Sequence, residues 1–326
     1  MSPLIEARGL TIAYATRERR SIALDGAELT VERDESLALV GESGSGKTTL
    51  GMAIGRLLPP EARRESGDLL MDGRSIFAAG AEELRALRRD KLGFVFQNPM
   101  TALDPTMRAG RQVALALGGA SAETVRTLLA RVELPDPDRV MRSFPHQLSG
   151  GMAQRVVIAM AIARKPLALI ADEPTASLDA SVRDRVMATL GRLRAETRAS
   201  LVILSHDLRM VARHAGRVAV MYGGRPVETG PVERVLKRPA HPYTRALLRA
   251  GAGGEKPGDR LEPISGSPPV LAGRAESCAF APRCPMRQAV CDQTRPEPRA
   301  VEGRLVACHF AEAMLAERAA AEETKP

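Results

Sequence analysis

Residues 41–48 read Gly-Glu-Ser-Gly-Ser-Gly-Lys-Thr, a spacing that suits phosphate binding. An apolar run over 37–40 precedes this loop, and the pattern predicts a helix from about Lys47 to Leu58. Glycines let backbone N–H groups turn toward phosphate oxygens, and the helix N-terminus adds positive potential. A chance glycine-rich turn would not explain both flanks. The predicted nucleotide-binding residues are Gly41, Glu42, Ser43, Gly44, Ser45, Gly46, Lys47, Thr48 and Thr49, with Lys47 on the β- and γ-phosphates and Thr48 on Mg²⁺.

Two carboxylates follow a second apolar run. Residues 167–171 predict a buried strand that ends at Asp172 and Glu173. Charged groups at the end of such a strand are costly without a task, so we expect Asp172 to orient Mg²⁺ and Glu173 to polarise the attacking water. An acidic pair that only complements a helix dipole is the alternative, and Pro174 directly after it argues against that. His206 follows the strand 201–204 and is expected at the same sheet edge, where it would sense the γ-phosphate.

The stretch Leu148-Ser149-Gly150-Gly151-Met152-Ala153-Gln154 is expected to open another helix. Ser149 suits an N-cap, and the two glycines leave N–H groups free to approach an anion. Taken alone this is a weak signal for an anion site.

All four cysteines lie near the C-terminus, at Cys278, Cys284, Cys291 and Cys308. A reducing compartment disfavours disulfides, so the candidates are a [4Fe–4S] cluster, zinc, or no metal. Zinc sites usually contain C-x2-C pairs, and this C-x5-C-x6-C-x16-C spacing has none. His309 is an alternative ligand beside the last cysteine.

These side chains must be positioned by an α/β fold. The patterns predict strands over 4–14, 22–31, 37–40, 93–97, 167–171 and 201–204, a strand pair over 67–77 with a turn at Asp72-Gly73, and helices over 122–132, 152–163 and 180–196. Buried strands that alternate with helices indicate a parallel sheet covered on both faces, with an inserted helical lobe. Residues 250–273 are rich in Gly and Pro and predict a linker, and a helical tail is expected from about residue 311.

Composition narrows the function classes. The chain has 326 residues, a net charge of +8, no Trp and only nine Phe and Tyr residues together, so it lacks stacking platforms for single-stranded nucleic acid. We interpret the charge as an arginine-rich solvated surface. No run of about 18 apolar residues exists to span a membrane, and the N-terminus lacks the pattern of a signal peptide. We therefore expect the chain to remain in the cytoplasm.

With these motifs in order, residues 1–250 resemble an ATP-binding-cassette ATPase. The resemblance implies a P-loop NTPase (RecA-like) core with an antiparallel β subdomain and a helical subdomain at about 98–165. Residues 148–154 resemble the family signature, and Ser177-Leu178-Asp179 resembles the D-loop. Gln97 resembles the Q-loop glutamine, which implies that it binds Mg²⁺ and takes part in catalysis. Tyr14 stands where the family places an aromatic ring under the adenine. Two cassettes would pair head to tail, so that Ser149, Gly150, Gly151, Gln154 and Asp179 act on the partner's ATP.

The resemblance narrows to the ATPases of dipeptide and oligopeptide importers. It rests on 144–152, on 170–175, on 96–101, and on His241-Pro242-Tyr243-Thr244, which begins an extension over 251–326 that holds the cysteines. In some members this extension binds a [4Fe–4S] cluster. Ala153 and Asn98 depart from the pattern, which has Arg and an acidic residue there. The departures bear on the signature helix and on the contact with the membrane subunit.

The implied protein is a motor at the cytoplasmic face of the inner membrane. Its implied partners are a second, paralogous ATPase, two membrane permease subunits and an extracytoplasmic solute-binding protein. Contact with the permease is expected at Phe94, Phe96 and 98–106. Alternatives are import of nickel, opines or glutathione, a soluble cassette ATPase that acts on nucleic acid, and an assembly scaffold.

Overall fold

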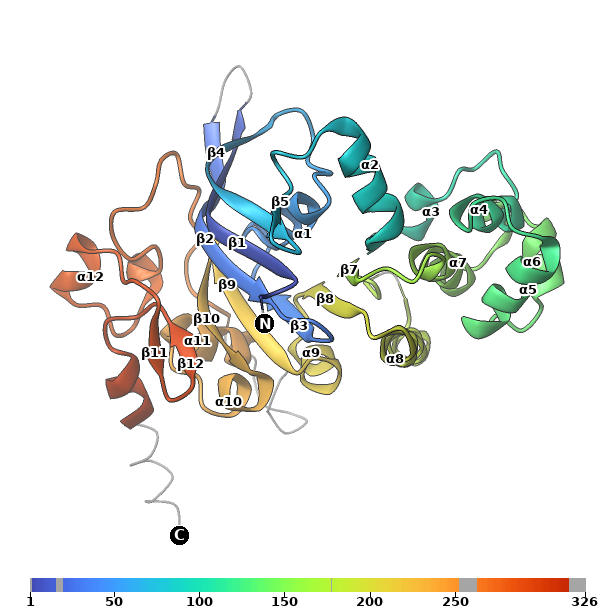
Figure 1. The fold of residues 1–326 in the computed structure, drawn as a ribbon. Helices are drawn as coiled ribbons and strands as arrows, with labels where there is room; N and C mark the ends of the chain where they lie inside the picture. Colours follow the sequence, from blue (N-terminus) through green and yellow to red (C-terminus); the bar gives the residue numbers. More distant parts are fainter. Residues whose placement is uncertain (1, 16–19, 177, 252–262, 317–326) are drawn as a thin grey trace, which may run out of the picture. The chain divides into compact units, whose positions relative to one another are not determined.

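A computed structural model of the chain describes residues 2–15, 20–176, 178–251 and 263–316. Its residues divide into two compact units. Unit 1 comprises 1–31, 36–78 and 204–326, and unit 2 comprises 32–35 and 79–203. Figure 1 shows the ribbon with the labels used below.

Unit 1 contains a four-stranded antiparallel sheet of order β2-β1-β4-β5. Its strands are β1 (Ile5–Ala15), β2 (Arg20–Val31), β4 (Ala62–Met71) and β5 (Arg74–Ser75). Ile5 of β1 lies opposite both Val31 and Met71, and all three side chains are buried. The predicted strands at 4–14 and 22–31 are thus confirmed, since their alternating apolar residues form one face of this sheet.

A second group of strands in unit 1 has the order β11-β12-β10-β9-β3. These are β3 (Ser36–Val40), β9 (Arg217–Tyr222), β10 (Arg225–Pro231), β11 (Arg299–Val301) and β12 (Arg304–Val306). Strands β3 and β9 run parallel, and the others pair antiparallel. The cysteine-bearing extension therefore adds two strands beside β10. The helices of unit 1 are α1 (Lys47–Ile54), α9 (Leu208–His214), α10 (Val232–Lys237), α11 (Pro242–Ala250) and α12 (Ala289–Gln293).

Unit 2 is mainly helical. Its strands β6 (Leu92–Val95) and β7 (Ala168–Asp172) pair in parallel, and β8 (Ser200–Ser205) follows in the order β8-β7-β6. Helices α4, α5 and α6 pack on one another, and α4 and α5 also pack on α7 (Figure 1). The helices are α2 (Ala81–Asp90), α3 (Pro99–Ala102), α4 (Ala109–Ala116), α5 (Ala122–Arg131), α6 (Pro137–Arg142), α7 (Gly150–Ile162) and α8 (Ala180–Thr197).

Two predicted boundaries were wrong. The helix expected over 47–58 ends at Ile54, because Gly55 caps it and the amide of Leu57 closes a turn onto the Met52 carbonyl. The strand expected over 93–97 is β6, which ends at Val95. Of the expected linker, residues 252–262 lie outside the described part of the chain, and residues 311–316 of the expected tail are helical.

Candidate functional site

The phosphate loop joins β3 to α1 in unit 1, as its flanking patterns predicted. Gly46 caps α1 with a φ of 101°, a left-handed value that favours glycine. A Cβ at Gly46 would lie 2.6 Å from the Ala23 carbonyl oxygen, and one at Gly41 would lie 2.3 Å from that of Met221. Both glycines are therefore required by backbone that passes close to the loop.

Lys47 points into this loop. Lys47 is buried, at 8% exposed. Its Nζ donates to the carbonyl oxygen of Gly41 at 2.7 Å and to that of Glu42 at 3.0 Å. A buried ammonium amid inward-facing backbone is a centre of positive charge that suits phosphate. Its role on the β- and γ-phosphates stays a prediction.

Tyr14 lies beside the same helix. It stands near the end of β1, and its hydroxyl is 3.3 Å from the Thr49 hydroxyl in the first turn of α1. The two predicted residues are thus brought together although 35 positions separate them. His206 also belongs to unit 1, directly after β8, and is exposed.

The acidic pair lies in unit 2, at the end of β7. All five residues of this strand are buried, and Asp172 is 5% exposed. Glu173 has a φ of 44°, in the left-handed region that a non-glycine residue seldom adopts. Backbone strain of this kind clusters at functional sites, where it holds a side chain in a set direction. The half-buried Glu173 therefore has the local geometry of a positioned carboxylate.

The signature stretch opens α7 in unit 2. Ser149 is the N-cap, and its Oγ accepts from the Met152 amide at 3.3 Å, as predicted. Ser149 and Gly150 are exposed, whereas Gln154 is only 1% exposed. Neither amide atom of Gln154 has a hydrogen-bond partner among the described residues. Gln154 is thus buried in α7, and its assignment to the partner's ATP stays a prediction.

Three further predicted positions lie in unit 2. Gln97 is exposed just after β6, and Asp179 caps α8 by accepting from the Val182 amide at 3.0 Å. Ser177 of the expected D-loop lies outside the described residues. The structure also describes the two residues that depart from the pattern of the peptide importers. Asn98 caps α3 by accepting from the Met100 amide, and Ala153 is completely buried in α7.

The predicted residues are therefore divided between the two units. Unit 1 holds Tyr14, the phosphate loop and His206, while unit 2 holds Gln97, the signature stretch, the acidic pair and Asp179. Sequence reasoning missed two residues at the loop itself. Arg283 forms an ion pair with the Glu42 side chain, and the Tyr243 hydroxyl accepts from the Glu42 amide at 2.9 Å.

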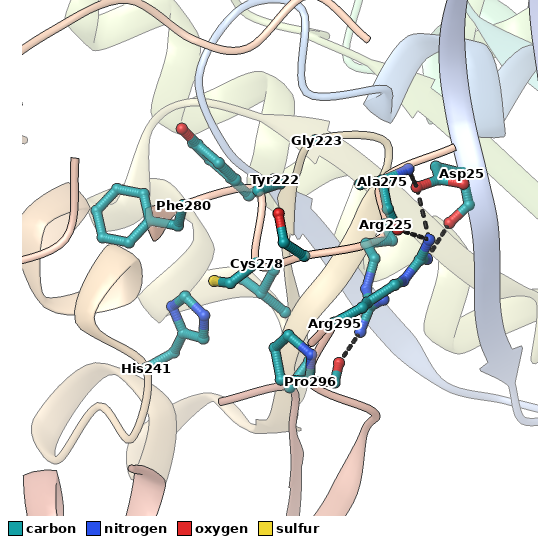
Figure 2. Close-up of a pocket in the computed structure, with 14 residues that line it drawn as sticks. Asp25, Tyr222, Gly223, Arg225, His241, Ala275, Cys278, Phe280, Arg295 and Pro296 are labelled. Atoms are coloured by element: carbon teal, nitrogen blue, oxygen red, sulfur yellow. Dashed lines mark hydrogen bonds and ion pairs between the residues drawn. The ribbon is translucent and has the colours of Figure 1, made fainter. Parts of the chain in front are cut away.

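The four cysteines gather in unit 1. The Cys278 amide donates to the Cys291 carbonyl at 2.9 Å, and Figure 2 shows Cys278 in a pocket with His241, Tyr222 and Phe280. Burial, together with negative charge on the other three cysteines, raises the pKa of the Cys308 thiol to about 12. The other three cysteines are thus within electrostatic reach of Cys308.

No group of three or more His, Cys, Asp or Glu side chains in the described ranges is arranged to hold a metal ion. The ring Nε2 of His309, the alternative ligand, lies 2.9 Å from the Thr294 carbonyl oxygen. The thiols therefore meet in one segment without forming a compact single-ion site.

Comparison with known proteins adds to this geometry. Residues 24–176 match the ABC transporter family, and residues 227–291 match the family described as oligopeptide/dipeptide transporter, C-terminal region. A Brucella abortus protein that carries the name of a putative peptide import ATP-binding protein is 39% identical over 314 residues, which cover 94% of this chain and 95% of that protein. A dipeptide transport ATP-binding protein of Bacillus subtilis is 37% identical and covers 91% of each chain.

Two solved structures are also similar. An ATP-binding cassette solved as a dimer in a post-hydrolysis state, bound to ADP and Pi, is 29% identical with a TM-score of 0.63 and covers 70% of this chain and 98% of its own. A subunit of an ABC transporter complex from Clostridium perfringens is 26% identical, with a TM-score of 0.62, over 73% of this chain and 92% of its own.

Proposed function

Because this chain belongs to the ABC transporter family, in its ATP-binding branch, we propose that it is the ATP-hydrolysing subunit of an importer of dipeptides or oligopeptides. The observation that carries the proposal is the pairing of a cassette with the peptide-transporter extension in one chain, as in relatives that match over nine tenths of their length. Among the described residues, no helix is long and apolar enough to cross a membrane. The path for the cargo is assigned to separate permease subunits.

The proposed reaction is attack of water on the γ-phosphorus of ATP. The water oxygen bonds to phosphorus, the bond to the β-phosphate oxygen breaks, and ADP and phosphate leave. Glu173 accepts a proton from the water, Lys47 stabilises negative charge on the transferred group, and His206 contacts the γ-phosphate. The left-handed backbone at Glu173 supports its role as a fixed base.

The residues assigned to Mg²⁺ are Thr48, Gln97 and Asp172. They offer a hydroxyl, an amide oxygen and a carboxylate, the hard oxygen donors that this ion prefers. The donor set therefore fits the ion, and Mg²⁺ when bound supplies neutralisation of phosphate charge. Within the chain, Asp172 ends a fully buried strand, which gives its carboxylate a fixed position.

A complete site requires a second cassette. We assign Ser149, Gly150 and Gly151 to the partner's ATP, with Asp179 at the same interface and Tyr14 under adenine. The exposure of Ser149 and Gly150 at the start of α7 supports this, because helix N-terminal amides attract anions. Similar cassettes have been solved as dimers. The pairing of two different, paralogous ATPases follows from the resemblance to peptide importers.

The permease is proposed to dock on a groove of unit 2. This groove has a volume of about 340 Å³. The residues that line it include the apolar Phe94, Leu115 and Met160 and three arginines. Leu115 is 57% exposed, and Phe94 stacks on Phe96 with ring centroids 5.9 Å apart. A groove lined by both apolar and arginine side chains suits a short amphipathic helix that carries carboxylates. The arginines that line the groove are Arg88, Arg89 and Arg164.

We further propose that the four thiols hold a [4Fe–4S] cluster. Such a cluster binds its thiolates through different iron atoms, so they stand farther apart than the ligands of one zinc ion. The support for the proposal is that all four cysteines of the chain lie in one segment, between positions 278 and 308, with a spacing that lacks the C-x2-C pairs usual for zinc. Iron and acid-labile sulfide in anaerobically purified protein, at about four of each per chain, is the expected result; one zinc and no iron would contradict it.

Function is tested in vesicles that contain the chain, its paralogue and the two permease subunits, with the solute-binding protein added. The motor is expected at the cytoplasmic face of the inner membrane. With ATP supplied on that face, a labelled dipeptide should be transported, and Lys47→Ala should abolish transport. Transport of nickel, an opine or glutathione instead would support the role of the chain as an ATP-driven motor and contradict the assignment of a peptide cargo. ATP-independent transport would reject both.

A further inference from the structure

Glu42, the second residue of the phosphate loop, forms a two-point ion pair with an arginine from the cysteine-bearing extension. Arg283 Nη1 lies 2.8 Å from Glu42 Oε2, and Nη2 lies 3.0 Å from Oε1. This two-point contact is the strongest geometry available to the pair. The side chains are 4% and 24% exposed, respectively, so solvent screens them little.

The main chain of Glu42 is fixed as well. Its amide donates to the Tyr243 hydroxyl of α11 at 2.9 Å, and its carbonyl accepts from Lys47 Nζ at 3.0 Å. Tyr243 is completely buried. The backbone and the carboxylate of Glu42 are therefore held from both sides, by the loop's own lysine and by residues that lie more than 200 positions further along the chain.

Arg283 is held in turn. Its Nε donates to the Ser265 carbonyl at 2.8 Å, and its guanidinium carbon lies 5.8 Å from the Tyr222 ring centroid. The Tyr222 ring packs edge-on against Phe280, with centroids 5.1 Å apart. These contacts fix the rotamer of Arg283, so its ion pair with Glu42 costs little further side-chain entropy.

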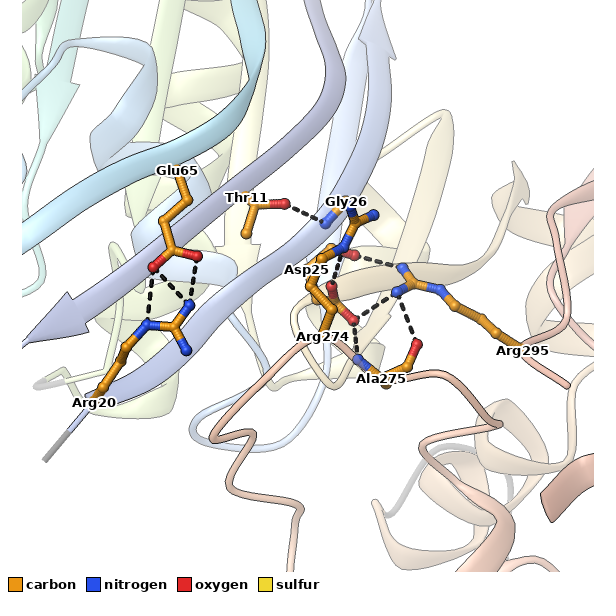
Figure 3. A network of polar contacts seen from close by, with 8 residues as sticks. All are labelled: Thr11, Arg20, Asp25, Gly26, Glu65, Arg274, Ala275 and Arg295. Carbon is orange, nitrogen blue, oxygen red and sulfur yellow. Dashed lines mark hydrogen bonds and ion pairs between the residues drawn. The ribbon is translucent and has the colours of Figure 1, made fainter. Parts of the chain in front are cut away.

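A second contact fixes the extension next to the same loop. Asp25 of β2 is completely buried, and Arg295 Nη1 lies 2.6 Å from its Oδ2 (Figure 3). The Ala275 amide donates to the same oxygen at 3.1 Å. Ala23, two residues before Asp25, has its carbonyl against Gly46 of the loop. The segment that carries Arg283 is therefore anchored both on Glu42 of the loop and on Asp25 of β2, a strand whose Ala23 lies against the loop.

The ion pair between Arg283 and Glu42 changes the charge beside the phosphate loop. A bare carboxylate at Glu42 would stand beside a loop that must hold the negatively charged phosphates of ATP, and burial would strengthen the repulsion. The guanidinium cancels this charge and fixes the residue that carries it. We propose that Arg283 is a positioning residue of the nucleotide site, through which the cysteine-bearing extension sets the affinity of the phosphate loop for ATP. The proposal rests on the proposed ATP-binding function.

The experiment measures the dissociation constant of Mg²⁺–ATP for the purified full-length chain by calorimetry. We expect Arg283→Gln to weaken binding about tenfold, the effect of one uncompensated charge near the phosphates after screening. Arg287→Gln is the matched control, since Arg287 belongs to the same segment but pairs with Asp292 at the surface, half exposed. It should bind as the wild type does.

A second variant separates charge from folding. Glu42→Gln combined with Arg283→Gln removes both charges and should restore affinity to within about threefold of the wild type. Arg283→Lys retains the charge without the fork and should fall between wild type and Arg283→Gln. If Arg283→Gln does not fold, Glu42→Gln alone should bind at least as tightly as the wild type, and weaker binding would overturn the proposal.

The remaining outcomes are also decisive. Wild-type affinity in a folded Arg283→Gln, or a double variant as weak as the single one, would reject the positioning role while leaving the function intact. Failure of the function itself has a different signature, in which the wild type binds Mg²⁺–ATP no better than Lys47→Ala does.

Discussion

Arg304 Nη1 lies 3.3 Å from Glu228 Oε1 in an ion pair that joins β12 of the extension to β10, with side chains 2% and 0% exposed. The amides of Ala240 and His241 donate to the two oxygens of the same carboxylate. Both charges are thus removed from water and stabilised by each other and by backbone groups, and Arg304 Nη2 also lies 3.6 Å from Glu302 Oε2. The extension is consequently tied to the cassette through a buried charge, as well as through apolar contacts.

Arg304→Met should lower the free energy of unfolding by about 3–5 kcal/mol, because it leaves Glu228 buried without its counter-charge. Denaturant unfolding measures this. Adding Glu228→Gln should recover part of the loss, since no unpaired charge then remains. Arg8→Met, which breaks an exposed pair with Glu6, should have no measurable effect. Equal losses in the Arg304 and Arg8 variants would contradict the account.

Stability should fall in mild acid because of His241. Its ring is buried and accepts at Nδ1 from the Tyr243 amide, and burial lowers its pKa from 6.5 to about 3. The folded chain keeps this ring neutral, whereas the unfolded chain protonates it below pH 6.5. Stability due to this group is complete above that pH, falls by about 2 kcal/mol between pH 7.5 and pH 5, and falls further toward pH 3.

Unfolding titrations of the wild type and of His241→Asn measure that dependence. The variant should lose this part of the slope between pH 7.5 and pH 5, whatever its absolute stability. Parallel pH profiles for the two proteins would show that another group is responsible.

Gly46→Ala should weaken Mg²⁺–ATP binding by more than about thirtyfold. A Cβ there overlaps the Ala23 carbonyl, and the φ of 101° strains any L-residue, so the start of α1 must shift. The control is Gly73→Ala, at a φ of 74° between β4 and β5 with open space around it. That variant should lose a little stability and no affinity. Unchanged binding by Gly46→Ala would contradict the geometry assigned to the loop.

Leu115→Glu should uncouple the motor. The change places a charge in the lining of the groove assigned to the permease, so assembly with permease subunits and ATP-driven transport should both be lost. Mg²⁺–ATP binding by the single chain should be unchanged. Leu305→Glu, at an exposed leucine of β12, is the matched control and should transport normally. Normal transport by Leu115→Glu would move the docking site elsewhere.

The phosphate loop could be predicted because its chemistry is carried by consecutive residues with local flanks. The strand ending at Asp172 and Glu173 was visible for the same reason, as an apolar run that stops at two charges. The end of α1 was not, since Pro59 suggested a later stop than the one that Gly55 and the turn at Leu57 produce. Local signals thus identified which residues matter better than they identified element ends.

Long-range pairs had no sequence signal at all. Arg283 and Glu42 lie 241 positions apart, and Asp25 and Arg295 lie 270 apart. One charged residue looks like another until the fold brings a buried partner to it. The burial of Gln154 was hidden for a related reason, because its side of α7 is defined by the helices that pack on it. Cassette boundaries at 98–165 and at 250, and the roles of the assigned residues, stay predictions.

The central claim is that the chain hydrolyses ATP with Glu173 as the base, in a site completed by a second cassette. Its most direct test is steady-state ATPase activity of the assembled transporter with Glu173→Gln in this chain, next to Mg²⁺–ATP binding by the same variant. We expect hydrolysis at this site to fall at least about a hundredfold while binding persists, because only proton transfer is removed. Wild-type turnover at this site would contradict the account.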